Sequence, residues 1–232
     1  MRIDVLTLFP EMFAPVLGAS ILKRAIAGDV AAVHVHDLRD WSRDKHRKVD
    51  DRPYGGGPGM VMRPEPFFEA VEQLKNSGQG TPRVVLLSPA GQPLTQQKVE
   101  DLSKARWLIL LCGHYEGVDE RVRAGLADEE LSIGDYVLTC GELPAMVLID
   151  SMVRLLPGSL GDQQSPEEES FRGNLLEYPQ FTRPVEFQGM RVPEVLLSGD
   201  HDRIREWRKL QALRRTATQR PDLVHGPSNS SD

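Results

Sequence analysis

A dense cluster of glycines is the first feature that could take part in ligand binding or catalysis. Residues 53–60 read Pro-Tyr-Gly-Gly-Gly-Pro-Gly-Met, and glycine lets a backbone approach a partner closely and adopt positive φ angles. The segment lacks the Gly-Lys-Ser/Thr ending of an ATP-binding P-loop and the Gly-x-Gly-x-x-Gly spacing of a dinucleotide site. A tight structural loop and a ligand contact both stay open, but ATP and NAD are disfavoured.

Several carboxylates and one arginine are candidates for proton transfer. Glu116, Asp135, Glu142 and the acidic run 167–169 supply the carboxylates. Acidic runs in polar segments are commonly solvated surface, so spacing alone does not choose among these groups. Arg154 is more informative because it lies among apolar residues, where an arginine usually requires an anion or a carboxylate as its partner.

Three further segments should line one pocket. Residues 87–89, 113–117 and 132–144 each follow a predicted strand, and open α/β sheets bind ligands just beyond the carboxyl ends of their strands. Glycines in these segments leave backbone groups open to hydrogen bonding, while Tyr136 and Leu138 offer apolar walls. The residues alone indicate a small-molecule site, and an adenosine would suit it.

Alternating strands and helices must position these segments. Nearly continuous apolar runs are typical of strands buried on both faces of a parallel sheet, and His34 and His36 alternate with valines as residues on the faces of a strand rather than as metal ligands. Apolar residues at three- and four-residue steps predict a helix from Met12 to Ile26 that ends at Gly28. This order is typical of an α/β fold with a parallel sheet. The expected strands are 3–9, 33–35, 83–87, 107–112 and a piece within 129–139, and a further helix is expected at 146–156.

The carboxyl-terminal third changes character. Residues 157–189 are rich in Pro, Gly, Ser and acidic residues and are too long for an ordinary connection, so we interpret them as a functional linker. An apolar stripe among arginines then predicts a small helical domain with a basic outer face. The stripe consists of Ile204, Trp207, Leu210 and Leu213. The predicted division is a first domain at 1–160, a linker at 161–190 and a helical domain at 191–232, with a frayed tail after Pro221.

Composition places the chain among ordinary globular proteins. It has 232 residues, of which 40% are hydrophobic and 27% charged, values that disfavour disordered or disulfide-stapled classes and allow a sizeable core. Cys112 and Cys140 lack the spacing of a disulfide framework or of a zinc site. No apolar run is long enough to span a bilayer, and no export signal precedes the first strand. We expect a cytoplasmic protein with no membrane partner, and we predict no metal site.

Charge is unevenly distributed along the chain. A formal net charge of -6 counts against a nucleic-acid partner, because phosphate contacts dominate such affinity. Two basic stretches nevertheless stand out, and each is either a solvated surface or a nucleic-acid contact. The first holds Arg39, Arg43, Lys45, Arg47, Lys48 and Arg52, and the second holds Arg203, Arg205, Arg208, Lys209, Arg214, Arg215 and Arg220.

Ordered segments over nearly the whole chain carry a resemblance to one protein family. They are 1–4 (MRID) with Phe9 and Pro10, 49–51 (VDD) before the glycine cluster, 112–119 (CGHYEGVD), 132–138 (SIGDYVL), 178–184 (YPQFTRP) and 192–201 (VPEVLLSGDH). In these segments the chain resembles the bacterial tRNA (guanine-N1)-methyltransferases of the SPOUT superfamily. Chance agreement at so many ordered segments is negligible.

The resemblance implies a fold that general rules would miss. It is an α/β parallel sheet whose carboxyl-terminal part passes through a loop as a trefoil knot, followed by a small helical domain, although generic topology rules treat knots as essentially absent. In that family the knot loops bind S-adenosylmethionine. The residues implied for cofactor binding here are Leu87, Ser88, Pro89, Gly113, Tyr115, Glu116, Gly117, Ser132, Ile133, Gly134, Asp135, Tyr136, Val137, Leu138, Cys140, Gly141 and Pro144.

The resemblance also implies partners. The family acts on tRNA as a homodimer with active sites shared between subunits, and the acceptor would be N1 of the guanosine immediately 3′ of the anticodon. The flipped base would be read between the glycine cluster and the linker, while the basic helix contacts phosphates and tRNA orders the linker. A need for magnesium is implied too, without ligands that the sequence places. The residues expected to bind substrate are Asp50, Tyr54, Gly55, Gly56, Gly57, Pro58, Gly59, Ser165, His201, Arg208 and Arg214.

Two positions depart from the family pattern. The family uses an aspartate before Ser-Phe as general base, and Glu169 stands there in this chain, with Arg154 as the expected electrostatic helper. The extra methylene moves the carboxylate by more than about an ångström, a displacement that can cost roughly 100-fold in rate unless the loop adjusts. Cys140 stands where the family usually has glycine, and we expect it to pack as a small apolar residue and to alter cofactor affinity slightly.

Three alternatives stay open beside this reading. One is a SPOUT methyltransferase that acts on another RNA nucleotide. Another, motivated by Glu169, is a tRNA-binding protein without efficient turnover. The third is a nicotinamide or ATP enzyme with an α/β sheet, which the missing phosphate-loop signatures disfavour.

Overall fold

The chain forms two compact units. The computed structural model describes residues 1–78, 80–160 and 169–225, and the units are Met1–Gly161 and Asp162–Asp232. In the part of the chain that is described, no helix is both long enough and apolar enough to cross a membrane.

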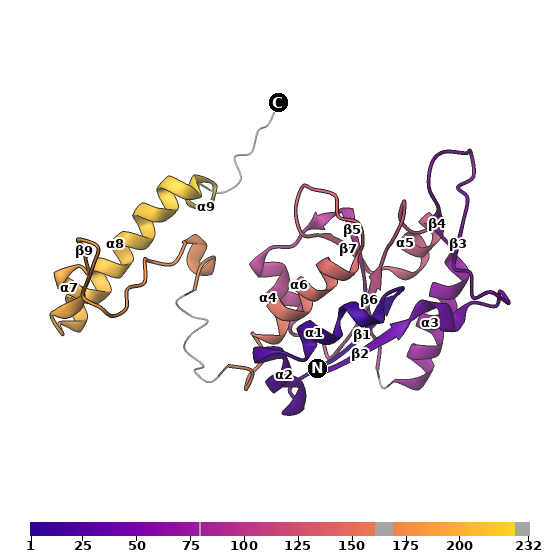
Figure 1. Cartoon of the computed structure of the whole chain (residues 1–232), viewed down its shortest axis with the longest axis horizontal. Helices are drawn as coiled ribbons and strands as arrows, with labels where there is room; N and C mark the ends of the chain where they lie inside the picture. Colours follow the sequence, from indigo (N-terminus) through magenta and orange to yellow (C-terminus); the bar gives the residue numbers. More distant parts are fainter. Residues whose placement is uncertain (79, 161–168, 226–232) are drawn as a thin grey trace. The chain divides into compact units, whose positions relative to one another are not determined.

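A parallel sheet forms the centre of the first unit (Figure 1). Its strand order is β2-β1-β6-β5-β7, and every neighbouring pair is parallel. Each residue of β6 is buried, because apolar side chains of this strand alternate between two covered faces. The prediction of an α/β fold with a parallel sheet is therefore confirmed. The strands are β1 (Arg2–Thr7), β2 (Ala32–Asp37), β5 (Arg83–Pro93), β6 (Trp107–Cys112) and β7 (Glu129–Ser132).

Helices cover both faces of this sheet (Figure 1). On one face, Leu108 and Leu110 of β6 pack with α1 (Ala14–Leu17), α2 (Ser20–Ala27), α4 (Gln96–Leu102) and α6 (Glu142–Val153). On the other face, Ile109 and Leu111 pack with η2 (Leu38–Trp41), α3 (Pro64–Ser77) and α5 (Glu120–Leu126). Two hydrophobic cores therefore hold the carboxyl ends of the strands in fixed positions.

Two predicted elements differ in the structure. The single helix expected from Met12 to Ile26 is divided into η1 (Pro10–Met12), α1 and α2, because Ala19 is extended between Gly18 and Ser20. The strand expected at 83–87 does not stop at Ser88 but continues as β5 to Pro93, with an irregular register against β7 between Leu87 and Gln92. Local periodicity and turn residues predicted neither the break at Ala19 nor the extension of β5, because tertiary contacts determine both.

The glycine cluster lies in an arch between two short strands. Strand β3 (Asp50–Asp51) pairs in antiparallel fashion with β4 (Val61–Met62), and residues 52–60 connect them. This connection, hereafter the glycine arch, extends away from the sheet in Figure 1.

The second unit contains one long helix and several short elements. Asp200 begins the long helix α8 (His201–Gln219) by accepting hydrogen bonds from the backbone N–H groups of Asp202 and Arg203 at 3.2 and 3.1 Å. Among the described residues of this unit, only Ala212 and Thr216 are buried. The frayed tail predicted after Pro221 is wrong for 221–225, which form α9 (Pro221–His225). The other elements are η4 (Arg172–Asn174), β8 (Glu186–Phe187), β9 (Met190–Arg191) and α7 (Glu194–Leu197).

Candidate functional site

A pocket of about 410 Å³ lies against the middle of β5 and opens beyond the carboxyl ends of β6 and β7. Its volume is in the range of small-molecule sites, roughly 300–1,000 Å³. Apart from Asp135, which is exposed and lies outside it, every residue expected to bind cofactor lines this pocket. These lining residues are Leu87, Ser88, Pro89, Gly113, Tyr115, Glu116, Gly117, Ser132, Ile133, Gly134, Tyr136, Val137, Leu138, Cys140, Gly141 and Pro144.

One side of the pocket is formed where the segment before α6 lies against the end of β6. His114 and Cys140 form an antiparallel bridge, and the Gly141 N–H donates to the Gly113 carbonyl at 2.8 Å. A Cβ atom at Gly141 would lie 2.7 Å from the Gly113 nitrogen and 2.8 Å from the Cys112 Cα. Glycine is therefore required at position 141 by the closeness of two backbones.

The wall formed by 132–138 combines hydrogen-bonded turns with apolar surface. The Ser132 hydroxyl donates to the Gly134 carbonyl at 3.0 Å, and the Tyr136 hydroxyl donates to the Ile133 carbonyl at 3.2 Å. These bonds fix the turn, so that Ile133 and Leu138 line the pocket from a defined backbone. Such a wall suits a flat, largely apolar ring.

Charged residues that the sequence analysis missed complete the pocket. Glu120 and Arg123 of α5 and Glu130 of β7 line it together with Glu116. Arg123 pairs with Glu120 and lowers the pKa of that carboxyl group by its hydrogen bond. Three carboxylates against one arginine favour a ligand that carries positive charge. The signal for α5 was Asp119, whose side chain accepts from the Arg121 N–H at the helix start.

His114 is a further lining residue beyond the predicted ones. Its ring packs between Phe9 and Tyr115, with ring centroids 5.0 and 4.6 Å away. Its Nδ1 atom is buried without a hydrogen-bond partner in the described structure. His114 therefore shapes the pocket mainly through its packed ring.

Glu142 is a candidate for proton transfer in the sequence, but in the structure it is a buried residue of the protein core. The residue is fully buried at the start of α6 and accepts a hydrogen bond from the Thr7 hydroxyl at 2.6 Å. It does not line the pocket. Burial raises the pKa of the neighbouring Cys112 thiol well above its usual range, and the nearby Glu142 carboxylate adds to this effect. Cys112 is therefore held as an unreactive thiol.

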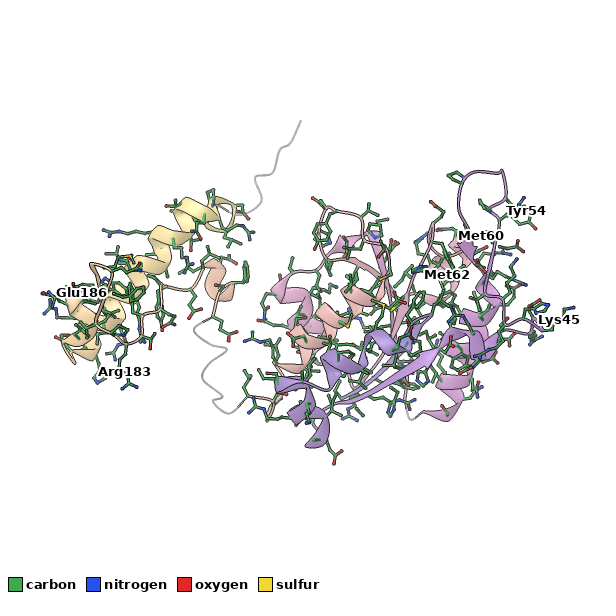
Figure 2. All side chains as sticks on the ribbon, viewed as in Figure 1. Lys45, Tyr54, Met60, Met62, Arg183 and Glu186 are labelled. Carbon is green, nitrogen blue, oxygen red and sulfur yellow. The ribbon has the colours of Figure 1, made fainter. Side chains whose placement is uncertain are left out.

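The base of the glycine arch is attached directly to the pocket loop. The Glu116 N–H donates to the Met60 carbonyl and the Met62 N–H donates to the Gly117 carbonyl, both at 3.0 Å. Tyr54, in contrast, is 100% exposed, and Figure 2 shows it on the arch away from Met62. The arch thus offers a free aromatic side chain and bare glycine backbone next to the pocket.

The two expected catalytic residues belong to different units. Arg154 is the carboxyl-terminal cap of α6, and its N–H donates to the Asp150 carbonyl at 3.2 Å. Glu169 is half-buried and precedes a turn in which the Ser170 hydroxyl accepts from the Glu177 N–H at 3.0 Å. Ser165, Glu167 and Glu168 lie outside the described residues.

A backbone contact holds the Glu169 turn on α8. The Leu176 N–H donates to the Thr216 hydroxyl at 2.8 Å, and Thr216 is fully buried. His201, Arg208 and Arg214 all lie on the same helix, with the Arg208 guanidinium 4.7 Å from the centre of the Tyr178 ring. The expected general base, Glu169, and the expected RNA contacts on α8 therefore belong to the same unit.

The described residues do not form a cluster of potential metal ligands. No group of three or more His, Cys, Asp or Glu side chains there is placed to hold a metal ion. The side chains described do not fit a magnesium site.

Comparison with known proteins identifies the family. Residues 1–226 match the sequence model of the family described as tRNA (guanine-1)-methyltransferase TrmD. The chain belongs to this family. Membership confirms the resemblance found in the sequence, and the chain is a methyltransferase.

Curated relatives agree with this membership. A tRNA (guanine-N(1)-)-methyltransferase of Halalkalibacterium halodurans is 57% identical over 226 residues, which cover 97% of this chain and 92% of the relative. The protein of the same name from Moorella thermoacetica is 57% identical over 225 residues, 97% of this chain and 90% of its own. The one from Geobacillus kaustophilus is 55% identical over 224 residues, covering 97% and 91%.

Proposed function

We propose that the chain transfers a methyl group from S-adenosylmethionine to N1 of the guanosine immediately 3′ of the anticodon of tRNA. The observation that carries this proposal is the pocket between the middle of β5 and the carboxyl ends of β6 and β7, together with the family membership. We place the activity in the cytoplasm, where tRNA is the available acceptor.

The pocket matches the chemistry of this methyl donor. The adenine ring would pack on the wall that contains Ile133, Tyr136 and Leu138. The positive charges of the donor would lie among Glu116 and Glu130. Bound there, the donor supplies a methyl group on a sulfonium sulfur. Asp135 lies outside the pocket lining, so its contribution to donor binding would come through the backbone turn that it shares with Tyr136.

The glycine arch is the proposed contact for the acceptor base. Its base adjoins Glu116, and Tyr54 and the bare backbone of Gly55 and Gly56 are open to a flipped nucleotide. Asp50 stands in β3 at the start of the arch. The arginines of α8, among them Arg208 and Arg214, would contact phosphates and so supply affinity rather than sequence selection.

Glu169 and Arg154 are the proposed catalytic pair. Guanine N1 carries a proton at neutral pH, so it becomes nucleophilic only when that proton leaves. Glu169 would accept the N1 proton as the new N1–methyl bond forms and the sulfur–methyl bond breaks, which leaves a neutral thioether. Arg154 would stabilise the negative charge that builds on guanine O6. Glu169 is one methylene longer than the aspartate that the family resemblance implies.

We further propose a homodimer with shared active sites and a knotted first domain. Val137, which is 83% exposed, and Val147, which is 48% exposed on α6, are apolar surface that a second copy would cover. The return of residues 139–141 to the end of β6 is the contact expected of a knotted crossing. The proposed domains are a cofactor domain at 1–160, an active-site linker at 161–190 that includes Ser165, and a tRNA-binding domain at 191–232.

The test uses the full chain, methyl-labelled S-adenosylmethionine and two tRNA transcripts. One transcript has guanosine immediately 3′ of the anticodon and the other has adenosine at that position. We expect label only in the first, recovered as 1-methylguanosine after digestion. Label at another nucleotide would favour a different RNA target. Donor and tRNA binding without transfer would favour the alternative that Glu169 motivates, a binding protein without turnover.

A further inference from the structure

Glu116 has a fixed backbone but a carboxylate without a bonded partner. Its N–H donates to the Met60 carbonyl at 3.0 Å, and it stands between Tyr115 and Gly117, which have φ angles of 58° and 115°. In the described structure, no hydrogen bond or ion pair holds its carboxylate. The direction of this carboxylate within the pocket lining is therefore set by the groups that pack on it.

Gly59 of the glycine arch is the group that lies on the Glu116 side chain. A Cβ atom built at Gly59 would fall 2.7 Å from Glu116 Cδ and closer still to Cγ and Oε1. Real Cβ atoms do not approach so closely, so any side chain at position 59 would displace Glu116. The φ angle of Gly59 is 76°, which also favours glycine.

The remainder of the arch lacks such contacts. Cβ atoms built at Gly55 and Gly56 would meet nothing within 4 Å, and Tyr54 is fully exposed. Figure 2 shows Tyr54 on the part of the arch that runs out from Met60. The arch is therefore in close contact with the pocket at its base, at Gly59 and Met60.

We propose that Gly59 is a positioning residue that sets the direction of the Glu116 carboxylate and thereby couples the glycine arch to the methyl-donor pocket. This inference rests on the proposed function, because it takes the pocket as the donor site and the arch as the acceptor contact. A nucleotide that moves the base of the arch would move Glu116. Conversely, a donor that fixes Glu116 would fix the base of the arch, since coupling between two sites is reciprocal.

A matched pair of variants tests the positioning role. Gly59→Ala and Gly56→Ala place the same methyl group at φ angles of 76° and 79°, so their backbone strain is alike, but only the first meets Glu116. Calorimetry of S-adenosylmethionine binding to the full chain without RNA should show affinity about tenfold weaker for Gly59→Ala and within about twofold of wild type for Gly56→Ala. Equal effects of the two variants would overturn the proposal. Absence of binding to the wild-type chain would instead overturn the proposed function.

A double substitution separates positioning from general damage to the fold. In the Glu116→Ala background, the Cγ, Cδ and Oε1 atoms that the new methyl would displace are gone. Gly59→Ala should then have no further effect on donor affinity, so the two substitutions should be strongly non-additive. Additive losses would show that Gly59→Ala acts through the fold rather than through Glu116.

Reciprocal binding tests the coupling. The affinity of the wild-type chain for the tRNA transcript should change by about fivefold or more when the unreactive product S-adenosylhomocysteine is present. Gly59→Ala should reduce this factor, and Gly80→Ala, whose Cβ atom lies outside the arch and would meet nothing within 4 Å, should leave it near the wild-type value. A wild-type tRNA affinity that does not respond to the product, or an equal factor in both variants, would contradict the coupling.

Discussion

The two units of the chain bury their apolar side chains to very different extents. In the first unit all residues of β6 are buried and helices cover both faces of the sheet. Among the described residues of the second unit, only Ala212 and Thr216 are buried, while Met190 is 66% exposed and Leu197 52%. Apolar burial is the main favourable term in folding. We therefore infer that the first unit is stabilised by its own hydrophobic core, whereas the described part of the second unit has little core of its own.

This difference predicts a division of roles. Substitutions in the first unit should change stability or donor binding, and substitutions in the second should change methyl transfer or RNA affinity with little effect on the core.

Filling the pocket should abolish donor binding. Cys140→Trp places an indole ring in a pocket of about 410 Å³ that Cys140 lines, so S-adenosylmethionine affinity measured by calorimetry should fall more than about 100-fold. Cys140→Gly, which restores the residue implied by the family resemblance, should stay within a few-fold of wild type. Unchanged binding to Cys140→Trp would place the donor elsewhere.

A second pair concerns the stability of the first unit. Gly141→Ala forces a methyl group against the backbone at Gly113 and Cys112, whereas a Cβ at Gly113 would meet the Val118 side chain at an ordinary 3.6 Å. Overpacking of this kind costs roughly 1–3 kcal/mol. Denaturant unfolding should show such a loss for Gly141→Ala and a much smaller one for Gly113→Ala. Equal stability of the two variants would contradict the close crossing of backbones.

Acid should reveal the contribution of buried Asp4. Burial raises the pKa of this carboxyl group, but hydrogen bonds from His36, Arg2 and Trp107 outweigh burial and lower it from 3.8 to about 2. The unfolded state therefore binds the proton first as pH falls, and about 2 kcal/mol of stability present above pH 4 is lost toward pH 2. Unfolding of wild type and Asp4→Asn between pH 5 and 2 should show their difference shrinking. A difference independent of pH would contradict this assignment.

The smallest expected effect concerns RNA affinity. Arg214 is exposed on α8, and as a phosphate contact its loss should weaken binding of many tRNA sequences alike. Arg214→Ala should lower the slope of log affinity against log salt by about 1, without a change in thermal stability. Lys104→Ala, which removes an exposed cation of the first unit, is the control and should leave the slope unchanged. A loss restricted to one tRNA sequence would argue against a phosphate contact.

Much of the first unit could be predicted from local sequence. The run from Trp107 to Cys112 and the glycine at 113 predicted a buried strand that ends at a loop; the strand is present, and Gly113 lines the pocket. These features depend on neighbours in sequence, so periodicity detects them. The break at Ala19 and the continuation of β5 beyond Ser88 depend on tertiary contacts, and periodicity missed them.

Local sequence patterns also predicted only part of the candidate site. Glu120, Arg123 and Glu130 line the pocket because α5 follows the end of β6 and β7 pairs with β5, and no spacing rule predicts this arrangement. The contact between Gly59 and Glu116 joins residues 57 positions apart in sequence. The roles of Glu169 and Arg154 came from the family resemblance, since local patterns left several carboxylates equivalent.

Single-turnover methyl transfer by Glu169→Gln tests the central claim most directly. With saturating S-adenosylmethionine and tRNA, we predict a rate about 10²–10⁴-fold below wild type, because glutamine cannot accept the N1 proton. Glu169→Asp should retain transfer, and donor affinity should be unchanged in both variants. Transfer by Glu169→Gln at the wild-type rate would contradict the account and assign the base to another residue.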